Sequence, residues 1–99
     1  MKIKKGVQVG LIQPQVNLAL IIANQIWNNL GQELVVTSGD DGQHMQDSLH
    51  YQGFGVDLRT RYFEHHEKIS AFTQLTRNLG NNFDVIMHDT HIHMEYDPK

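Results

Sequence analysis

Three side chains that suit a metal ion lie far apart in the sequence, at His50, Asp57 and His93. Two imidazoles and one carboxylate, with a fourth position open to water, form the ligand set of a catalytic zinc ion. Bound zinc lowers the pKa of that water to about 7, so hydroxide becomes available at neutral pH. Seven histidines offer several such triples, so the residue types alone predict the site only weakly. The alternatives are a loop histidine that caps a backbone group and an Asp57 that pairs with Arg59.

The composition excludes several other kinds of chemistry. The chain has 99 residues and no cysteine, so it has no disulfides, no thiolate metal ligands and no thiol nucleophile. Eight basic and eleven acidic residues give a net charge of −3, which argues against a nucleic-acid partner. We expect one domain over residues 1–99, because chains divide into several cores only at about 250 residues. We also expect a monomer.

The amino-terminal region resembles a secretion signal only in part. Basic residues lie within 1–5 and an apolar run covers 18–23, but Asn17 interrupts the pattern and no small-residue cleavage site follows. No stretch reaches the ~20 apolar residues of a membrane span. The sequence therefore predicts a protein without a signal peptide or a membrane segment, made in the cytoplasm.

The elements that must position the candidate ligands follow from periodicity and from helix-ending residues. A helix is predicted between Pro14 and Gly31, and a second helix over 62–79. Short β-branched or alternating runs predict strands, at 34–38, 56–59, 83–87 and 91–96. The polar, glycine-containing segment 40–55 predicts a long loop that binds something or is tied down. The expected fold class is α+β: a small antiparallel sheet backed by two helices, with the zinc site on the open face.

Strand alternation predicts which side chains share that open face. Successive side chains in a strand point to opposite sides of the sheet. Asp57 and Arg59 therefore share one face of their strand, and His91, His93 and Glu95 share one face of the last strand. The apolar residues between them face the core.

A longer pattern supports the three ligands. It consists of Asp41-Gly-Gln-His44, Ser48-Leu-His-Tyr51, Gly53, Val56-Asp57 and His91-Ile-His93. In this order, the residues resemble the zinc D-alanyl-D-alanine carboxypeptidase and hedgehog superfamily. There, a Ser-x-His-x-x-Gly-x-x-x-Asp pattern supplies two zinc ligands and the second histidine of a late His-x-His supplies the third. The resemblance implies zinc as the cofactor, with His50, Asp57 and His93 as its ligands.

The resemblance also suggests substrate-binding residues. His44 matches a position beside the metal or the substrate in the hedgehog branch, with a solvated loop residue as the equally weighted alternative. Ser48 and Arg59 are the other candidates for substrate binding. The carboxypeptidases hold the terminal carboxylate of the substrate with an arginine after the first strand, which is absent from Gly39-Asp-Asp-Gly42. Arg59 or Arg61 could replace it, but the absence makes endopeptidase action more plausible.

The general base departs from the family pattern. Carboxypeptidase relatives place an acid three residues before the last ligand, where this chain has Thr90, and hedgehog proteins place a glutamate six before it, where this chain has Met87. A base must approach the reacting proton within about 3 Å or through one water. We rank Asp89 first, His91 second and His88 third. His91 could also orient the water, stabilise the oxyanion or support a ligand.

The resemblance implies a zinc-dependent peptidase that cleaves stem peptides of bacterial peptidoglycan. It would act as a D-alanyl-D-alanine carboxypeptidase or as an L,D-endopeptidase. By analogy, the small size suggests a phage-type lysis or entry enzyme, made in the host cytoplasm and acting on the cell wall. The alternative is a hedgehog-like zinc-binding interaction module with little or no peptidase activity, which the missing acids favour.

Overall fold

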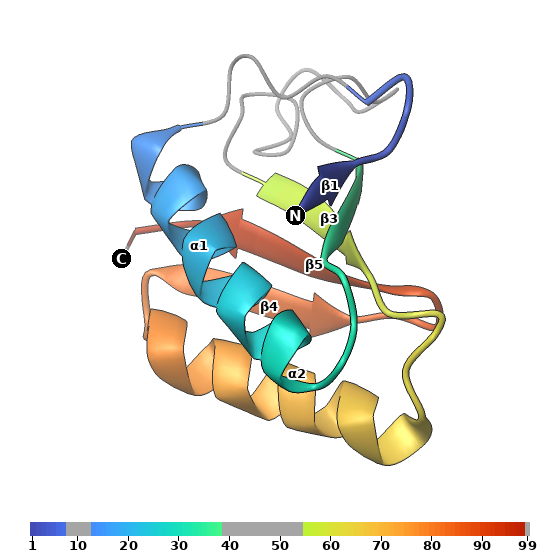
Figure 1. The fold of residues 1–99 in the computed structure, drawn as a ribbon. Coiled ribbons are helices and arrows are strands. Elements are labelled where there is room, and N and C mark those ends of the chain that lie inside the picture. Colours follow the sequence, from blue (N-terminus) through green and yellow to red (C-terminus); the bar gives the residue numbers. More distant parts are fainter. Residues whose placement is uncertain (8–12, 39–54, 99) are drawn as a thin grey trace.

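The computed structural model describes residues 1–7, 13–38 and 55–98 (Figure 1). Five strands and two helices occur in this part of the chain. In chain order they are β1 (Lys2–Ile3), α1 (Pro14–Asn29), β2 (Val35–Ser38), β3 (Gly55–Arg59), α2 (His65–Leu79), β4 (Phe83–Met87) and β5 (His91–Tyr96).

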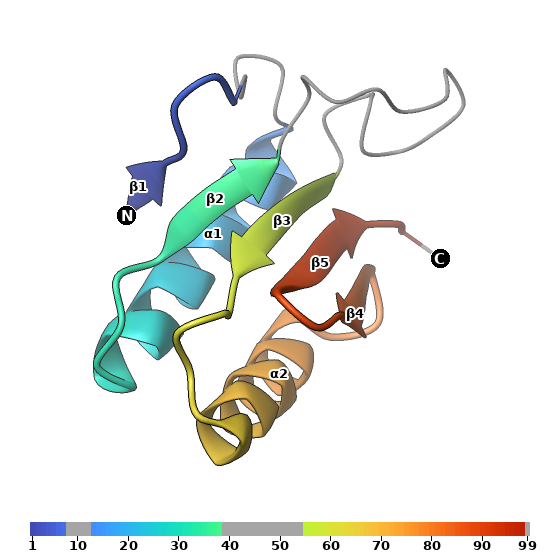
Figure 2. The same ribbon diagram turned by 90° about the vertical axis from the view of Figure 1, so that its right-hand side faces the viewer.

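The strands form one sheet in the order β1-β2-β3-β5-β4. All pairings are antiparallel except that of β1 with β2, which is parallel. Both helices cover the same side of the sheet, and the opposite side carries no described helix (Figures 1 and 2). The predicted fold class is therefore confirmed, with β1 as an additional parallel edge strand.

Helix α1 follows the predicted pattern of apolar residues. Its buried residues recur at spacings of three and four: Val16, Ala19, Leu20, Ala23, Ile26 and Trp27. Pro14 occupies the first turn, where a missing N–H costs nothing. Gly31, with φ of 84°, reverses the chain after the helix, which a residue without a Cβ does at little cost. Neither described helix combines the length and the apolar character that crossing a membrane requires.

Helix α2 begins at His65, three residues later than predicted. The N–H of Phe63 donates to the carbonyl of Thr60, so these residues form a turn before the helix. Glu64 and Glu67 form a capping box in which each side chain accepts a hydrogen bond from the backbone N–H of the other. This exchange satisfies two N–H groups that the first turn leaves unpaired, and it fixes the start of the helix.

Trp27 links α1 to Arg59, the last residue of β3. Its ring is fully buried and lies 5.5 Å from the ring of Phe63. The indole Nε1–H donates to the carbonyl oxygen of Arg59 over 3.0 Å. One side chain therefore both fills the core and holds the strand that carries Asp57 and Arg59.

Trp27→Ala is expected to lower the free energy of unfolding by about 3–5 kcal/mol, because it leaves a cavity and an unpaired carbonyl. Urea denaturation followed by circular dichroism measures this loss. Leu18→Ala is the control on the same helix, since Leu18 is 63% exposed and should change stability by only about 0.5 kcal/mol. Equal losses in the two variants would contradict the packing described for Trp27.

Candidate metal centre

Cross-strand pairing places Asp57 and His93 directly opposite each other on β3 and β5. In the same register, Arg59 lies opposite His91, two residues further along β3 than Asp57. The intervening residues of both strands point into the core and are fully buried: Val56, Leu58, Ile92 and Met94. The predicted division of side chains between the two faces is therefore confirmed.

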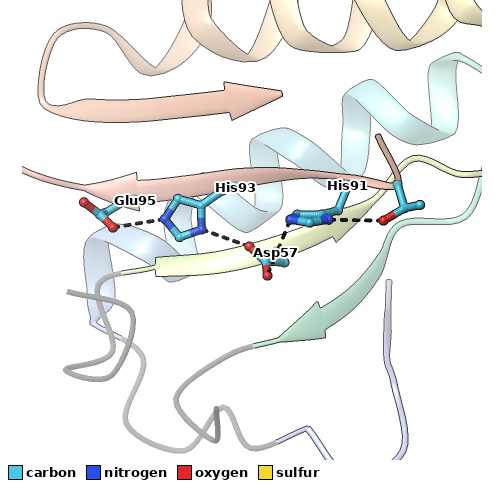
Figure 3. A network of polar contacts seen from close by, with 5 residues as sticks. Asp57, His91, His93 and Glu95 are labelled. Carbon is cyan, nitrogen blue, oxygen red and sulfur yellow. Dashed lines mark hydrogen bonds and ion pairs between the residues drawn. The ribbon is translucent and has the colours of Figure 1, made fainter. Parts of the chain in front are cut away.

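The imidazole of His93 lies between two carboxylates (Figure 3). Its Nδ1 is 2.9 Å from Oδ1 of Asp57, and its Nε2 is 3.0 Å from Oε1 of Glu95. An ionised carboxylate only accepts hydrogen bonds, so both contacts are satisfied together when both ring nitrogens carry a proton. Two acids therefore hold the imidazole of His93, one at each ring nitrogen.

The pKa of His93 reflects this environment. Burial lowers the pKa, because it disfavours the charged ring, but the hydrogen bonds and negative charges of Asp57 and Glu95 outweigh it. The net result is a pKa above the ordinary value of 6.5. The site therefore favours a positive charge at the position between His93 and Asp57.

A metal ion can take the place of the proton between these two groups. Two ligands of a tetrahedral zinc ion, each about 2.0–2.1 Å from the metal, lie about 3.3 Å apart. Nδ1 of His93 and Oδ1 of Asp57, at 2.9 Å, need only a small separation to accept an ion. One neutral nitrogen and one carboxylate oxygen are also donors that zinc prefers. These two predicted ligands therefore fit the metal.

His50, the third predicted ligand, lies outside the described residues, as do His44 and Ser48. Their roles stay predictions.

His91 lies beside the Asp57–His93 pair. Its Nε2 is 3.9 Å from Oδ2 of Asp57, so the two carboxylate oxygens of Asp57 face two different histidines (Figure 3). Its Nδ1 lies 3.3 Å from the hydroxyl oxygen of Thr90, and its ring stacks on that of His88 at 4.6 Å. The His91 side chain is 30% exposed, which leaves it within reach of a bound molecule.

Asp89, the base ranked first from the sequence, lies in the exposed turn between β4 and β5. Its backbone carbonyl accepts a hydrogen bond from Nζ of Lys68 over 2.9 Å. His91 lies on β5 and faces Asp57, whereas Asp89 lies in the turn before that strand. Which of the two handles protons stays a prediction.

A hollow with a basic lining adjoins the His91 end of the metal centre. It is lined by Lys4, Thr37, Arg59, Arg61, Thr90 and His91. The guanidinium carbon of Arg59 lies 4.7 Å from the centre of the Tyr62 ring, a cation–π contact that orients the side chain. Arg59, predicted to bind substrate, is therefore placed beside the candidate metal ligands.

Three carboxylates gather at the other end of the open face. Oxygen atoms of Asp84, Glu95 and Asp97 lie within 4.8 Å of one another. In the described residues, this is the only group of three potential ligand side chains that meets this limit. The sequence placed Glu95 on the correct face but gave it no role. The contact of Glu95 with His93 could have been expected from the His-x-Glu spacing, because this spacing puts the two side chains side by side on one face of a strand.

The raised pKa of His93 predicts how the stability of the metal-free protein depends on pH. Folding raises the pKa, so the stabilisation is fully present below the unfolded value of 6.5 and is lost as the pH rises through the folded value. In EDTA, the melting temperature of the wild type should exceed that of His93→Gln by more at pH 6 than at pH 8.5. A difference that is constant or grows with pH would contradict the assigned direction.

The chain matches the family model of the Hedgehog amino-terminal signalling domain over residues 9–96. This family has the fold of the zinc peptidases. The match spans every described element except β1, and it includes all three predicted zinc ligands.

Proposed function

Because the chain belongs to the family of Hedgehog amino-terminal signalling domains, whose fold is that of the zinc peptidases, we propose that it is a zinc-dependent peptidase. His50, Asp57 and His93 would hold the ion. The observation that carries the proposal is the 2.9 Å approach of His93 Nδ1 to Asp57 Oδ1 on an open sheet face. Bound zinc would supply an activated water and polarise the carbonyl of a peptide bond.

The position of His91 supports a role in proton transfer. Its Nε2 faces the second oxygen of Asp57 at 3.9 Å, on the same face as the proposed metal ligand His93. A neutral His91 can accept a proton from the attacking water, and a protonated His91 can donate to the oxyanion or to the leaving amine. Asp57 would hold the imidazole in place between these steps.

The basic hollow supports a substrate with a free carboxylate. Arg59 and Arg61 both line it, together with Lys4. A guanidinium group binds a carboxylate through two parallel hydrogen bonds, which gives orientation as well as affinity. This arrangement favours carboxypeptidase action over endopeptidase action. A stem peptide of bacterial peptidoglycan as the substrate, and a phage-type enzyme as its source, stay predictions that rest on the resemblance.

Digestion of purified peptidoglycan stem peptides, followed by mass analysis of the products, tests this function. The zinc-loaded protein should release single carboxy-terminal residues, and EDTA should stop the release. The same peptides with an amidated carboxyl terminus are the matched control, and they should be cleaved more slowly. No products from any peptide with the zinc-loaded protein would overturn the proposal.

A zinc-bearing interaction module is the second candidate function. The observation that favours it is the absence of an acid at the two positions where relatives place one. Met87 occupies the first on β4, and Thr90 occupies the second in the turn before β5. Zinc would then contribute mainly to folding, because binding to the folded state alone stabilises it. EDTA should in that case lower the melting temperature although the zinc-loaded protein hydrolyses nothing.

A further inference from the structure

We propose that Glu95 is a positioning residue for the metal ligand His93, which it holds through Nε2 so that Nδ1 faces Asp57. This inference rests on the proposed zinc site. It assigns a function to a carboxylate that touches neither the proposed ion nor a substrate.

The contact between Glu95 and His93 fixes the direction of the imidazole. The two residues are neighbours on one face of β5, and Oε1 of Glu95 lies 3.0 Å from Nε2 of His93. Because the two ring nitrogens lie on different edges of the imidazole, anchoring Nε2 commits Nδ1 to the opposite direction. That direction is the Asp57 side chain, at 2.9 Å (Figure 3).

The same contact determines which nitrogen can bind an ion. A neutral imidazole has one N–H donor and one acceptor nitrogen. If Nε2–H donates to Glu95, the lone pair must be on Nδ1, where a metal can use it. A carboxylate that accepts from the distal N–H also makes the ligating nitrogen more basic, which strengthens the bond to the metal.

Glu95 and His93 lie in a partly buried, acidic part of the open face. Asp84 is its cross-strand partner on β4, and Asp97 follows two residues later. Oxygen atoms of the three side chains lie within 4.8 Å of one another. The side chains of His93 and Glu95 are only 17% and 21% exposed, so solvent screens their interaction incompletely.

Zinc affinity measured by competition with a chromophoric chelator tests the proposal. Glu95→Ala should weaken zinc binding by about 10–100-fold, the usual cost of losing such a partner. Glu95→Gln keeps an oxygen acceptor but loses the charge, so its affinity should lie between those of Glu95→Ala and the wild type. Glu33→Ala is the control: it removes one negative charge from an exposed residue before β2 and should leave the affinity unchanged.

Nitrogen-15 NMR of the imidazole rings supplies a readout that a merely structural role would not affect. In the zinc-loaded wild type, His93 should carry its proton on Nε2, and Glu95→Gln should preserve this tautomer. In Glu95→Ala the Nε2–H signal should exchange faster with water, since its acceptor is gone.

The results separate this inference from the proposed function. If the wild type binds zinc and Glu95→Ala binds it with the same affinity, the positioning role is overturned and the zinc site stands. If Glu95→Gln abolishes binding while Asp57→Asn retains it, Glu95 is itself a ligand and the inference is wrong. If the wild type binds no zinc, the proposed function fails first and the inference fails with it.

Discussion

His93→Ala is expected to abolish zinc binding. The variant loses the imidazole whose Nδ1 faces Asp57. Of the proposed ligands in the described part of the chain, Asp57 then remains, and one carboxylate cannot hold the ion. Loss of a residue that only hydrogen-bonds a metal ligand can weaken zinc binding by about 100-fold. Loss of the ligand His93 itself should weaken it further. In a thermal scan, zinc at 100 times its dissociation constant stabilises a protein by about 2.7 kcal/mol. The melting temperature of the wild type should therefore rise by about 10–20 °C on zinc addition, and that of His93→Ala should not change.

His50→Ala and Asp57→Asn should behave in the same way, because each removes one of the three proposed ligands. His66→Ala is the matched control, since His66 is an exposed histidine on α2. It should bind one equivalent of zinc, as the wild type does. One full equivalent of zinc in His93→Ala would contradict the ligand assignment.

His91→Gln is expected to reduce the rate of peptide hydrolysis by about 10²–10⁴-fold, the range that general acid–base assistance supplies. Zinc content should stay at one equivalent, because His91 lies beside the proposed ligands without being one of them. The side chain of glutamine can still donate a hydrogen bond, but it cannot exchange a proton near neutral pH. Turnover of a stem peptide and metal content should be measured on the same preparation.

Asp89→Asn is the direct comparison for this experiment. Asp89 is exposed in the turn before β5, whereas His91 faces Asp57, so replacement of Asp89 should slow hydrolysis less than His91→Gln does. A greater loss in Asp89→Asn would contradict the choice of His91 and return Asp89 to the role that the sequence favoured.

The open face of the sheet was predictable because strand alternation is a strict geometric rule. Asp57, His93 and Glu95 share one side in the structure as the period of two requires. The pairing of β3 with β5 was not predicted, because strand order depends on long-range contacts and not on local pattern.

Other features depend on contacts that no local pattern specifies. Strand β1 has two residues, too few for any periodicity, and it forms only because β2 offers an edge with which it can pair. The start of α2 depends on the turn at Thr60 and on a glutamate at the capping position, where serine, threonine and aspartate are the usual signals.

The surroundings of the candidate bases could not be predicted for a similar reason. Asp89 and His91 are both close to His93 in the sequence, but His91 lies on β5 and faces Asp57, whereas Asp89 lies in the turn before that strand. The role of Glu95 depends on the orientation of one imidazole ring, which the sequence does not specify. These features require coordinates.

The most direct test of the account is a crystal structure of the zinc-loaded protein, with anomalous diffraction measured at the zinc absorption edge. The account predicts one strong peak about 2.0–2.2 Å from Nδ1 of His93 and from a carboxylate oxygen of Asp57. The imidazole of His50 should complete the protein ligands. A peak among Asp84, Glu95 and Asp97, or no peak on the open face, would contradict it.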